Sequence, residues 1–200
     1  MHALPVGNRR AAGFTLIELM VTVSIMALLA MLAVPAFSTW IANSKVRTIA
    51  NALQDGLRTA QTEATRRSRQ VVFALTDDSN PSDGYTAKEN GKYWAINTIT
   101  LTDSGETAAF VEAGVLAASG ANVTITGPVA VCFNSLGRLV TNASPGVTSA
   151  SCTAGDSTYK VELAGADRPL QVQIKLGGQV RMCDPARTLS ATQPDGCPAS

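Results

Sequence analysis

An apolar stretch from Phe14 to Trp40, in which Glu18 is the one charged residue, constrains this chain most. As a helix rising 1.5 Å per residue, the stretch is about 40 Å long, which is enough to cross a bilayer. Arg9 and Arg10 precede it, and basic residues that flank a membrane span stay on the cytoplasmic side. The sequence therefore predicts a membrane-spanning helix, with the rest of the chain outside the cytoplasm.

The position of Glu18 in this stretch requires an explanation, because placing a carboxylate in hydrocarbon costs a few kcal/mol unless it has a partner. A secretory signal peptide fits poorly, since the apolar run is too long and no A-x-A-like site closes it. A simple membrane anchor leaves Glu18 unexplained. Cleavage between Gly13 and Phe14 would place a new α-amine one helical turn from Glu18. We therefore expect Glu18 to pair with an amino terminus, of its own chain or of a neighbour.

All four cysteines lie in the C-terminal third of the chain. No C-x-x-C spacing occurs, which argues against a zinc ribbon or a thioredoxin-like site. An even number of cysteines beyond a membrane span indicates disulfides in an oxidising compartment. Three pairings are possible. Cys132–Cys152 with Cys183–Cys197 is favoured, because each bond closes a short loop rich in Gly, Ser and Pro.

The helical pattern continues after Trp40, but on one face only. Apolar side chains recur at helical spacing and charged or polar ones lie between them. This half of the helix is therefore expected to be amphipathic and to pack on other elements; its apolar positions are Val46, Ile49, Ala50, Leu53, Leu57, Ala60 and Ala64. Three arginines near its end, Arg66, Arg67 and Arg69, suit the negative end of the helix dipole.

Strand signals follow the helix. Short apolar or alternating runs occupy residues 71–75, 93–96, 123–126 and 129–133, and residues 135–157 are expected to be loop. The clearest pair is Tyr159–Leu163 with Leu170–Leu176, which alternates and is joined by the turn AGADRP, so it predicts a hairpin with one buried face. Val180 and Met182 extend this sheet. The fold class is α+β: a long N-terminal helix, transmembrane and then amphipathic, packed on a C-terminal antiparallel β-sheet.

The stretch GFTLIELMVTVSIMALLAMLAVPAF resembles the class III signal of type IV pilins and type II secretion pseudopilins. The resemblance implies that prepilin peptidase cleaves after Gly13 and N-methylates Phe14, and that Glu18 guides subunit docking. Pro35 stands where many pilins have a helix-loosening proline. The implied organisation is a prepilin leader (1–13), a transmembrane and filament-core helix (14–40) and a periplasmic globular domain (41–200), in the lollipop shape of pilins. The implied location is the inner membrane, crossed once, and then a pilus or pseudopilus.

Two later stretches, VCFNSLGRL and VQIKLGGQVRMCDPAR, are similar to the GspH/FimT family of minor pilins and pseudopilins. The resemblance implies a structural subunit that helps to initiate or cap type IV pilus assembly, with a type II secretion pseudopilin as the alternative. The implied partners are other pilins or pseudopilins, prepilin peptidase, and the inner membrane with its assembly platform.

DNA binding is a further alternative, since some FimT-type proteins bind DNA through Gly-Arg-x-Arg. Here the matching positions read Gly178-Gln179-Val180-Arg181, so only Arg181 matches. Lys175 and Arg187 extend a small basic patch around it, although Asp184 lies among them. A phosphate site gains affinity from each added cation, and the formal net charge of +1 argues against a dedicated polyanion binder.

No enzyme signature is present. The one histidine, His2, lies in the implied leader, which removes the commonest general base and metal ligand from the mature chain. Oxidised cysteines cannot act as nucleophiles, and neither G-x-S-x-G nor a P-loop occurs. Asp77, Asp78 and Asp83 lack the spacing of an EF-hand. We therefore expect no catalysis, no cofactor and no metal.

Overall fold

The computed structural model describes residues 13–100, 107–116 and 122–198. The chain divides into two compact units, residues 1–38 and 39–200. Helix α1 (Leu16–Arg66) begins in the first unit and ends in the second.

The part of α1 from Leu16 to Met31, in the first unit, exposes its large apolar side chains. Leu16, Ile17, Leu19 and Met20 are each more than 60% exposed, and so large an apolar surface calls for lipid or another protein to cover it. Within the residues that the structure describes, no single helix is long and apolar enough to cross a membrane. The stretches Leu16–Met31 and Ala36–Arg66 of α1, between which the helix bends, have the required length and composition when taken together.

The second unit contains two five-stranded sheets. The first has the order β3-β2-β1-β5-β6 and is antiparallel throughout. Its strands are β1 (Val71–Thr76), β2 (Tyr93–Thr98), β3 (Phe110–Val115), β5 (Ala130–Phe133) and β6 (Leu139–Val140), and a 3-10 turn, η1 (Pro81–Asp83), follows β1. The second sheet has the order β10-β9-β8-β7-β4 and is antiparallel except for the β9–β10 pair. Its strands are β4 (Val123–Thr126), β7 (Ser157–Leu163), β8 (Leu170–Ile174), β9 (Val180–Thr188) and β10 (Gly196–Cys197).

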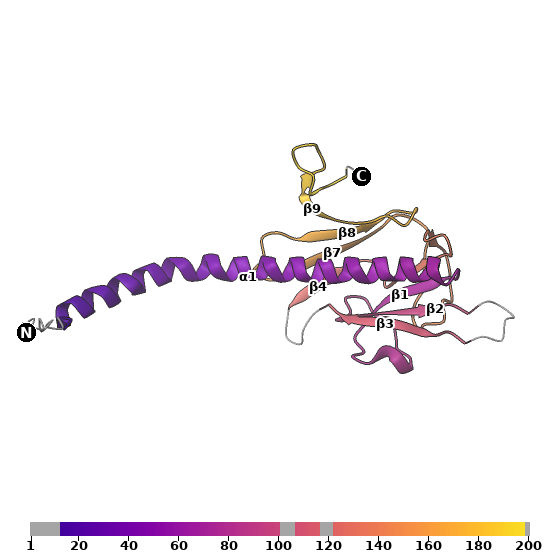
Figure 1. The fold of residues 1–200 in the computed structure, drawn as a ribbon, viewed down its shortest axis with the longest axis horizontal. Coiled ribbons are helices and arrows are strands. Elements are labelled where there is room, and N and C mark those ends of the chain that lie inside the picture. Colours follow the sequence, from indigo (N-terminus) through magenta and orange to yellow (C-terminus); the bar gives the residue numbers. More distant parts are fainter. Residues whose placement is uncertain (1–12, 101–106, 117–121, 199–200) are drawn as a thin grey trace, which may run out of the picture. The chain divides into compact units, whose positions relative to one another are not determined.

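One hydrophobic core joins the second half of α1 to both sheets. In Figure 1, strands β7 and β8 lie to one side of this half-helix and β1–β3 to the other. All seven apolar helix positions expected from the spacing are buried, each no more than 6% exposed. Phe73 in β1 contacts both Trp94 in β2 and Tyr159 in β7, with ring centroids 5.8 and 6.4 Å apart. The predicted amphipathic half-helix and its packing on antiparallel strands are confirmed.

Gly56 has a packing role in this half-helix. A Cβ added there would lie 2.8 Å from Cε2 of Trp94 and 3.0 Å from Cε2 of Phe73. A glycine inside a helix costs about 1 kcal/mol relative to alanine. Here the absence of a side chain at Gly56 allows the rings of Trp94 and Phe73 to lie directly against the helix backbone.

The first sheet is also covered on the face that lies away from the main core. A second buried cluster on this face includes Val72, Ala74, Tyr85, Ala95 and Cys132. All six residues of β1 are therefore buried, which explains its continuous apolar run. By contrast, β8 alternates between buried and half-buried residues, as expected of a strand with one buried face.

The hairpin prediction is confirmed in register, since Tyr159 pairs with Val172 and Val161 with Leu170. Leu176 does not share the buried face as expected: β8 ends at Ile174, and Leu176 lies in the following turn, 40% exposed. The single expected sheet is in fact two. Strands β3, β6 and β10 were not predicted, because β3 runs along a half-exposed edge and the other two have only two residues each.

Candidate functional site

The segment before helix α1 presents the predicted cleavage site openly. Gly13, Phe14 and Thr15 have no regular structure, and Phe14 is 83% exposed. A Cβ added to Gly13 would meet nothing within 4 Å. The Gly13–Phe14 peptide bond is therefore accessible in this chain, as a peptidase substrate must be. Residues 1–12, which include Arg9, Arg10 and His2, lie outside the described residues.

Glu18 lies in the first turn of α1, where Thr15 caps the helix. The Thr15 hydroxyl accepts a hydrogen bond from the backbone N–H of Glu18, 3.3 Å away, and the Thr15 carbonyl accepts one from Leu19 N, 3.2 Å away. A carboxylate in the first turn is also stabilised by the positive end of the helix dipole. The spacing Thr-x-x-Glu is that of a capping box, a local signal that the sequence-based prediction missed. The backbone N–H of Glu18 thus takes part in the helix cap, while the docking role of its side chain stays what the resemblance implies.

The two stretches that resemble the GspH/FimT family meet on one face of α1. Gln61 Nε2 donates a hydrogen bond to the Gly137 carbonyl, 2.9 Å away, and Leu139 N donates to the Leu176 carbonyl, 3.0 Å away. Gly178 has φ +92° and lies so close that an added Cβ would be 1.9 Å from the Gly137 oxygen. We call Gln61 with the turns at residues 134–138 and 175–178 the turn joint. It connects the helix to both sheets.

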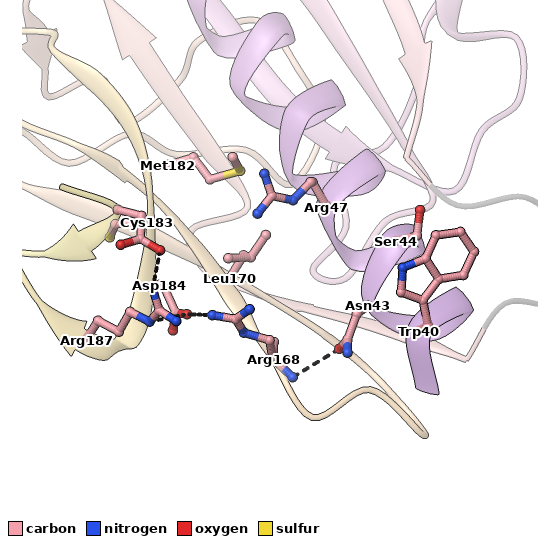
Figure 2. Close-up of a pocket in the computed structure, with 11 residues that line it drawn as sticks. Trp40, Asn43, Ser44, Arg47, Arg168, Leu170, Met182, Cys183, Asp184 and Arg187 are labelled. Atoms are coloured by element: carbon pink, nitrogen blue, oxygen red, sulfur yellow. Dashed lines mark hydrogen bonds and ion pairs between the residues drawn. The ribbon is translucent and has the colours of Figure 1, made fainter. Parts of the chain in front are cut away.

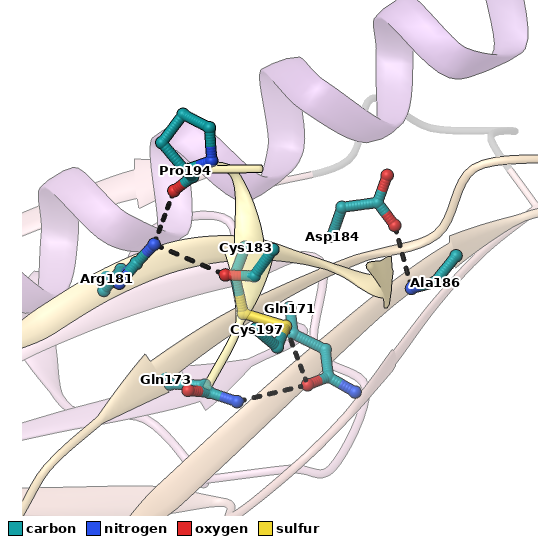
Figure 3. The surroundings of a disulfide bond; sticks show 9 residues. Gln171, Gln173, Arg181, Cys183, Asp184, Ala186, Pro194 and Cys197 are labelled. Atoms are coloured by element: carbon teal, nitrogen blue, oxygen red, sulfur yellow. Dashed lines mark hydrogen bonds between the residues drawn. A yellow bond between two sulfur atoms is a disulfide. The ribbon is translucent and has the colours of Figure 1, made fainter. Parts of the chain in front are cut away.

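Arg181, the one residue that matches the DNA-binding motif, contacts the C-terminal loop of its own chain. Its guanidinium donates hydrogen bonds to the carbonyls of Pro194, 2.6 Å away, and Gly196, 3.3 Å away (Figure 3). The Cys183–Cys197 disulfide fixes the same loop to β9, with the Cα atoms 5.0 Å apart.

Lys175 and Arg187, the other predicted DNA contacts, also have partners within the chain. Lys175 pairs with Asp156 at 2.8 Å, and this hydrogen bond holds the pKa of the Asp156 carboxyl below its usual range. Arg187 pairs with Asp195 at 2.9 Å. A DNA phosphate would have to compete with these groups, so DNA binding through the three cations stays a prediction.

The first disulfide joins Cys132 in β5 to Cys152, with Cα atoms 5.6 Å apart. Both cysteines are buried in the second cluster, so the bond fixes the segment after β6, which contains Cys152, to the first sheet. The structure therefore contains both of the bonds that the sequence favours.

The acidic loop after β1 is used for local structure. Asp77 accepts hydrogen bonds from the Lys88 ammonium and, at 3.2 Å, from the backbone N–H of Lys92, and the Lys88 bond lowers the pKa of Asp77. Asp78 accepts one from Asn80 N at 2.9 Å. Among the described residues, no group of three or more His, Cys, Asp or Glu side chains is placed to hold a metal ion.

A groove of about 440 Å³, not predicted from the sequence, separates α1 from β8 and β9 in the second unit. Asp184, with 7% of its side chain exposed, lies in its wall and pairs with Arg168 at 3.2 Å and Arg187 at 3.7 Å. Arg47 extends from the helix into the same groove (Figure 2). We call this feature the arginine groove.

Asn43 of α1 anchors the β7–β8 turn beside the arginine groove. Its side-chain oxygen accepts hydrogen bonds from the backbone N–H groups of Asp167, 3.2 Å away, and Arg168, 3.1 Å away. Its amide nitrogen donates to the Asp167 carboxylate at 2.6 Å. The position of Arg168 is therefore set by the helix as well as by its own strand.

Two family models match the chain. The model described as the prokaryotic N-terminal methylation motif matches residues 8–34, and that of type II transport protein GspH matches residues 50–178. The chain is also 31% identical over 167 residues to the type IV major fimbrial protein FimA of Dichelobacter nodosus, an alignment that covers 82% of this chain and 96% of that protein.

The chain is also similar to two solved structures. The type IV minor pilin FimU of Pseudomonas aeruginosa has a TM-score of 0.48 at 17% identity, covering 71% of this chain and 93% of that one. The minor pseudopilin EpsH from the type 2 secretion system of Vibrio cholerae has a TM-score of 0.45 at 11% identity, covering 72% of this chain and 99% of that one. The GspH match covers more than half of the chain and includes the whole turn joint and most of the core. With a methylation motif in front of that domain, the chain belongs to the GspH family of pilin-like subunits.

Proposed function

We propose that this chain is a minor subunit of a type IV pilus, with a non-catalytic role in starting or capping the filament. The observation that carries the assignment to a type IV pilus is the 31% identity to a type IV major fimbrial protein along 96% of that protein's length. The minor role is proposed from the match to the GspH family model. The exposed apolar helix surface of residues 14–31 supports the assignment to a filament, because a subunit held among other helices or in lipid would cover that surface.

The proposed maturation follows from the methylation motif and the open segment at Gly13. Prepilin peptidase cuts after Gly13 and methylates the new amino group of Phe14. The membrane holds the helix, the second unit lies in the periplasm, and its cysteines oxidise there. In the filament, Glu18 pairs with the amino terminus of a neighbouring subunit, which removes the cost of a lone carboxylate in an apolar surrounding.

The second candidate is a pseudopilin of a type II secretion system, which the description of the GspH family model favours. Both candidates share the maturation steps and differ in the machine that the subunit enters. Binding of DNA by Lys175, Arg181 and Arg187 is a further and weaker proposal, because each of these side chains already has a partner in its own chain.

Two measurements test these proposals. Intact mass and N-terminal sequencing of the protein from membranes should give a chain that begins at methylated Phe14 and is lighter by two hydrogen atoms for each disulfide. A chain that still begins at Met1 in cells with active prepilin peptidase would contradict the maturation. Deletion of the gene should then reduce the number of surface pili and leave protein secretion intact. Trapping of secreted proteins in the periplasm with normal piliation would favour the pseudopilin instead.

A further inference from the structure

The arginine groove carries more accessible positive charge than negative. Arg168 and Arg187 have side chains that are 50% and 42% exposed, and Arg47 is also exposed. Of the two carboxylates in the lining, Asp195 is 51% exposed, whereas Asp184 is almost entirely covered. A ligand that enters the groove therefore meets three guanidinium groups and one carboxylate.

The guanidinium groups differ in how they are held. Asp184 also accepts a hydrogen bond from Ala186 N at 2.9 Å, and its pairs with Arg168 and Arg187 fix these two side chains at the groove wall. Among the described residues, Arg47 has no hydrogen-bond or ion-pair partner. Figure 2 shows it extending from α1 toward Met182 and Leu170. Its fork of donors is available for a carboxylate, which guanidinium groups bind in a bidentate manner.

Besides the charged residues and the polar Asn43 and Ser44, the lining contains apolar side chains. Leu170 is buried, Met182 is half-buried, and Trp40 stands 64% exposed at one end of the groove. These residues suit an aliphatic or aromatic side chain next to the acid. DNA fits this lining poorly, because a phosphate backbone would leave the apolar surface unused. The volume matches a few side chains of a peptide.

We propose that the arginine groove binds a segment of a neighbouring pilin-like subunit in which an Asp or Glu is adjacent to an apolar residue. Arg47 pairs with the acid, and the apolar residue lies on Leu170 and Met182. The inference rests on the proposed function, because the partner it names is another subunit of the same filament.

The test places a photo-crosslinking amino acid at Ser44, an exposed residue of the groove lining, in the full chain in cells that assemble the filament. The crosslinked peptide is identified by mass spectrometry. We expect a peptide from another pilin-like subunit with an Asp or Glu within about two residues of the attachment point. Arg47→Glu should reduce the adduct about fivefold or more. Lys45→Glu, the same charge change on an exposed residue of α1 outside the groove lining, should leave it unchanged. Replacing the partner's acid with Arg should restore the adduct of the Arg47→Glu chain.

An adduct that is insensitive to Arg47→Glu, or a peptide that contains no acidic residue, would overturn the inference. So would loss of salt-sensitive retention on duplex DNA in Arg47→Glu but not in Lys45→Glu, because the groove would then bind a phosphate backbone. A second crosslinker at Val21, in the exposed apolar part of α1, tests the proposed function separately. Adducts from Val21 without adducts from Ser44 would reject the groove alone, whereas the absence of both would reject the filament role.

Discussion

Replacement of Gly178 by alanine should destabilise the second unit strongly, because three costs coincide at the turn joint. A φ of +92° is unfavourable for an L side chain by about 1–2 kcal/mol. The added Cβ would lie 1.9 Å from the Gly137 oxygen and 2.4 Å from Gln61 Nε2, so backbone atoms must move, and such overpacking costs about 1–3 kcal/mol. The movement also weakens the bond from Gln61 to Gly137, worth about 1 kcal/mol. We expect a total loss of about 4 kcal/mol.

Gly177→Ala is the matched control. Gly177 is the preceding residue in the same turn, it is exposed, and an added Cβ there would meet nothing within 4 Å. Thermal unfolding of the disulfide-bonded second unit, followed by circular dichroism, should show Gly178→Ala melting about 8–16 °C lower than the parent, at about 2–4 °C per kcal/mol. Gly177→Ala should melt within about 2 °C of the parent. Equal melting temperatures for the two variants would refute the close contact between the two turns.

Two further predictions concern charge and oxidation. Glu63 pairs with Arg66 and Arg67 at 2.7 and 2.6 Å, and their hydrogen bonds lower its pKa from 4.5 to about 2. A lowered pKa in the folded state gives stability that is present above the unfolded pKa and is lost as the pH falls toward 2. Glu63→Gln should therefore lower the free energy of unfolding by about 0.5–1 kcal/mol at pH 7 and by progressively less as the pH falls through 2, and a constant difference would contradict the pairing. Replacing both Cys132 and Cys152 with serine should cost about 3 kcal/mol in urea unfolding; a smaller effect of reductant on this variant than on the parent attributes the loss to the bond.

Local patterns predicted the parts of the fold that depend on a single element. The second half of α1 has one core face, and its seven apolar positions repeat at the helical period, so burial followed directly from spacing. The β7–β8 hairpin has alternating residues and a short connecting turn, which together set its register. The pairing of Cys183 with Cys197 followed from a short loop, which limits how far apart the ends can lie.

The pairings between distant segments were not predictable in the same way. Nothing local indicates that β5 pairs with β1 while β4 pairs with β7, so two sheets were taken as one. The arginine groove depends on the same kind of information. Arg47 and Arg168 come together because Asn43 fixes the β7–β8 turn to the helix, across 124 residues of sequence. The Thr15 cap is different, since its signal was local and was overlooked.

The turn joint explains why the family could be identified from the sequence while the partner could not. The two stretches that carry the resemblance contain glycines whose place is set by backbone contact, at Gly137 and Gly178, and a helix residue, Gln61, bonds to one of those turns. These residues hold the helix and the sheets together, so a sequence that keeps them keeps the fold. Arg47 makes no hydrogen bond or ion pair to any of the described residues. Neither the register of a strand nor the geometry of a turn therefore depends on it. A change at Arg47 should therefore alter which subunit the chain contacts and leave the fold intact, whereas a change at Gly178 should destabilise the fold itself.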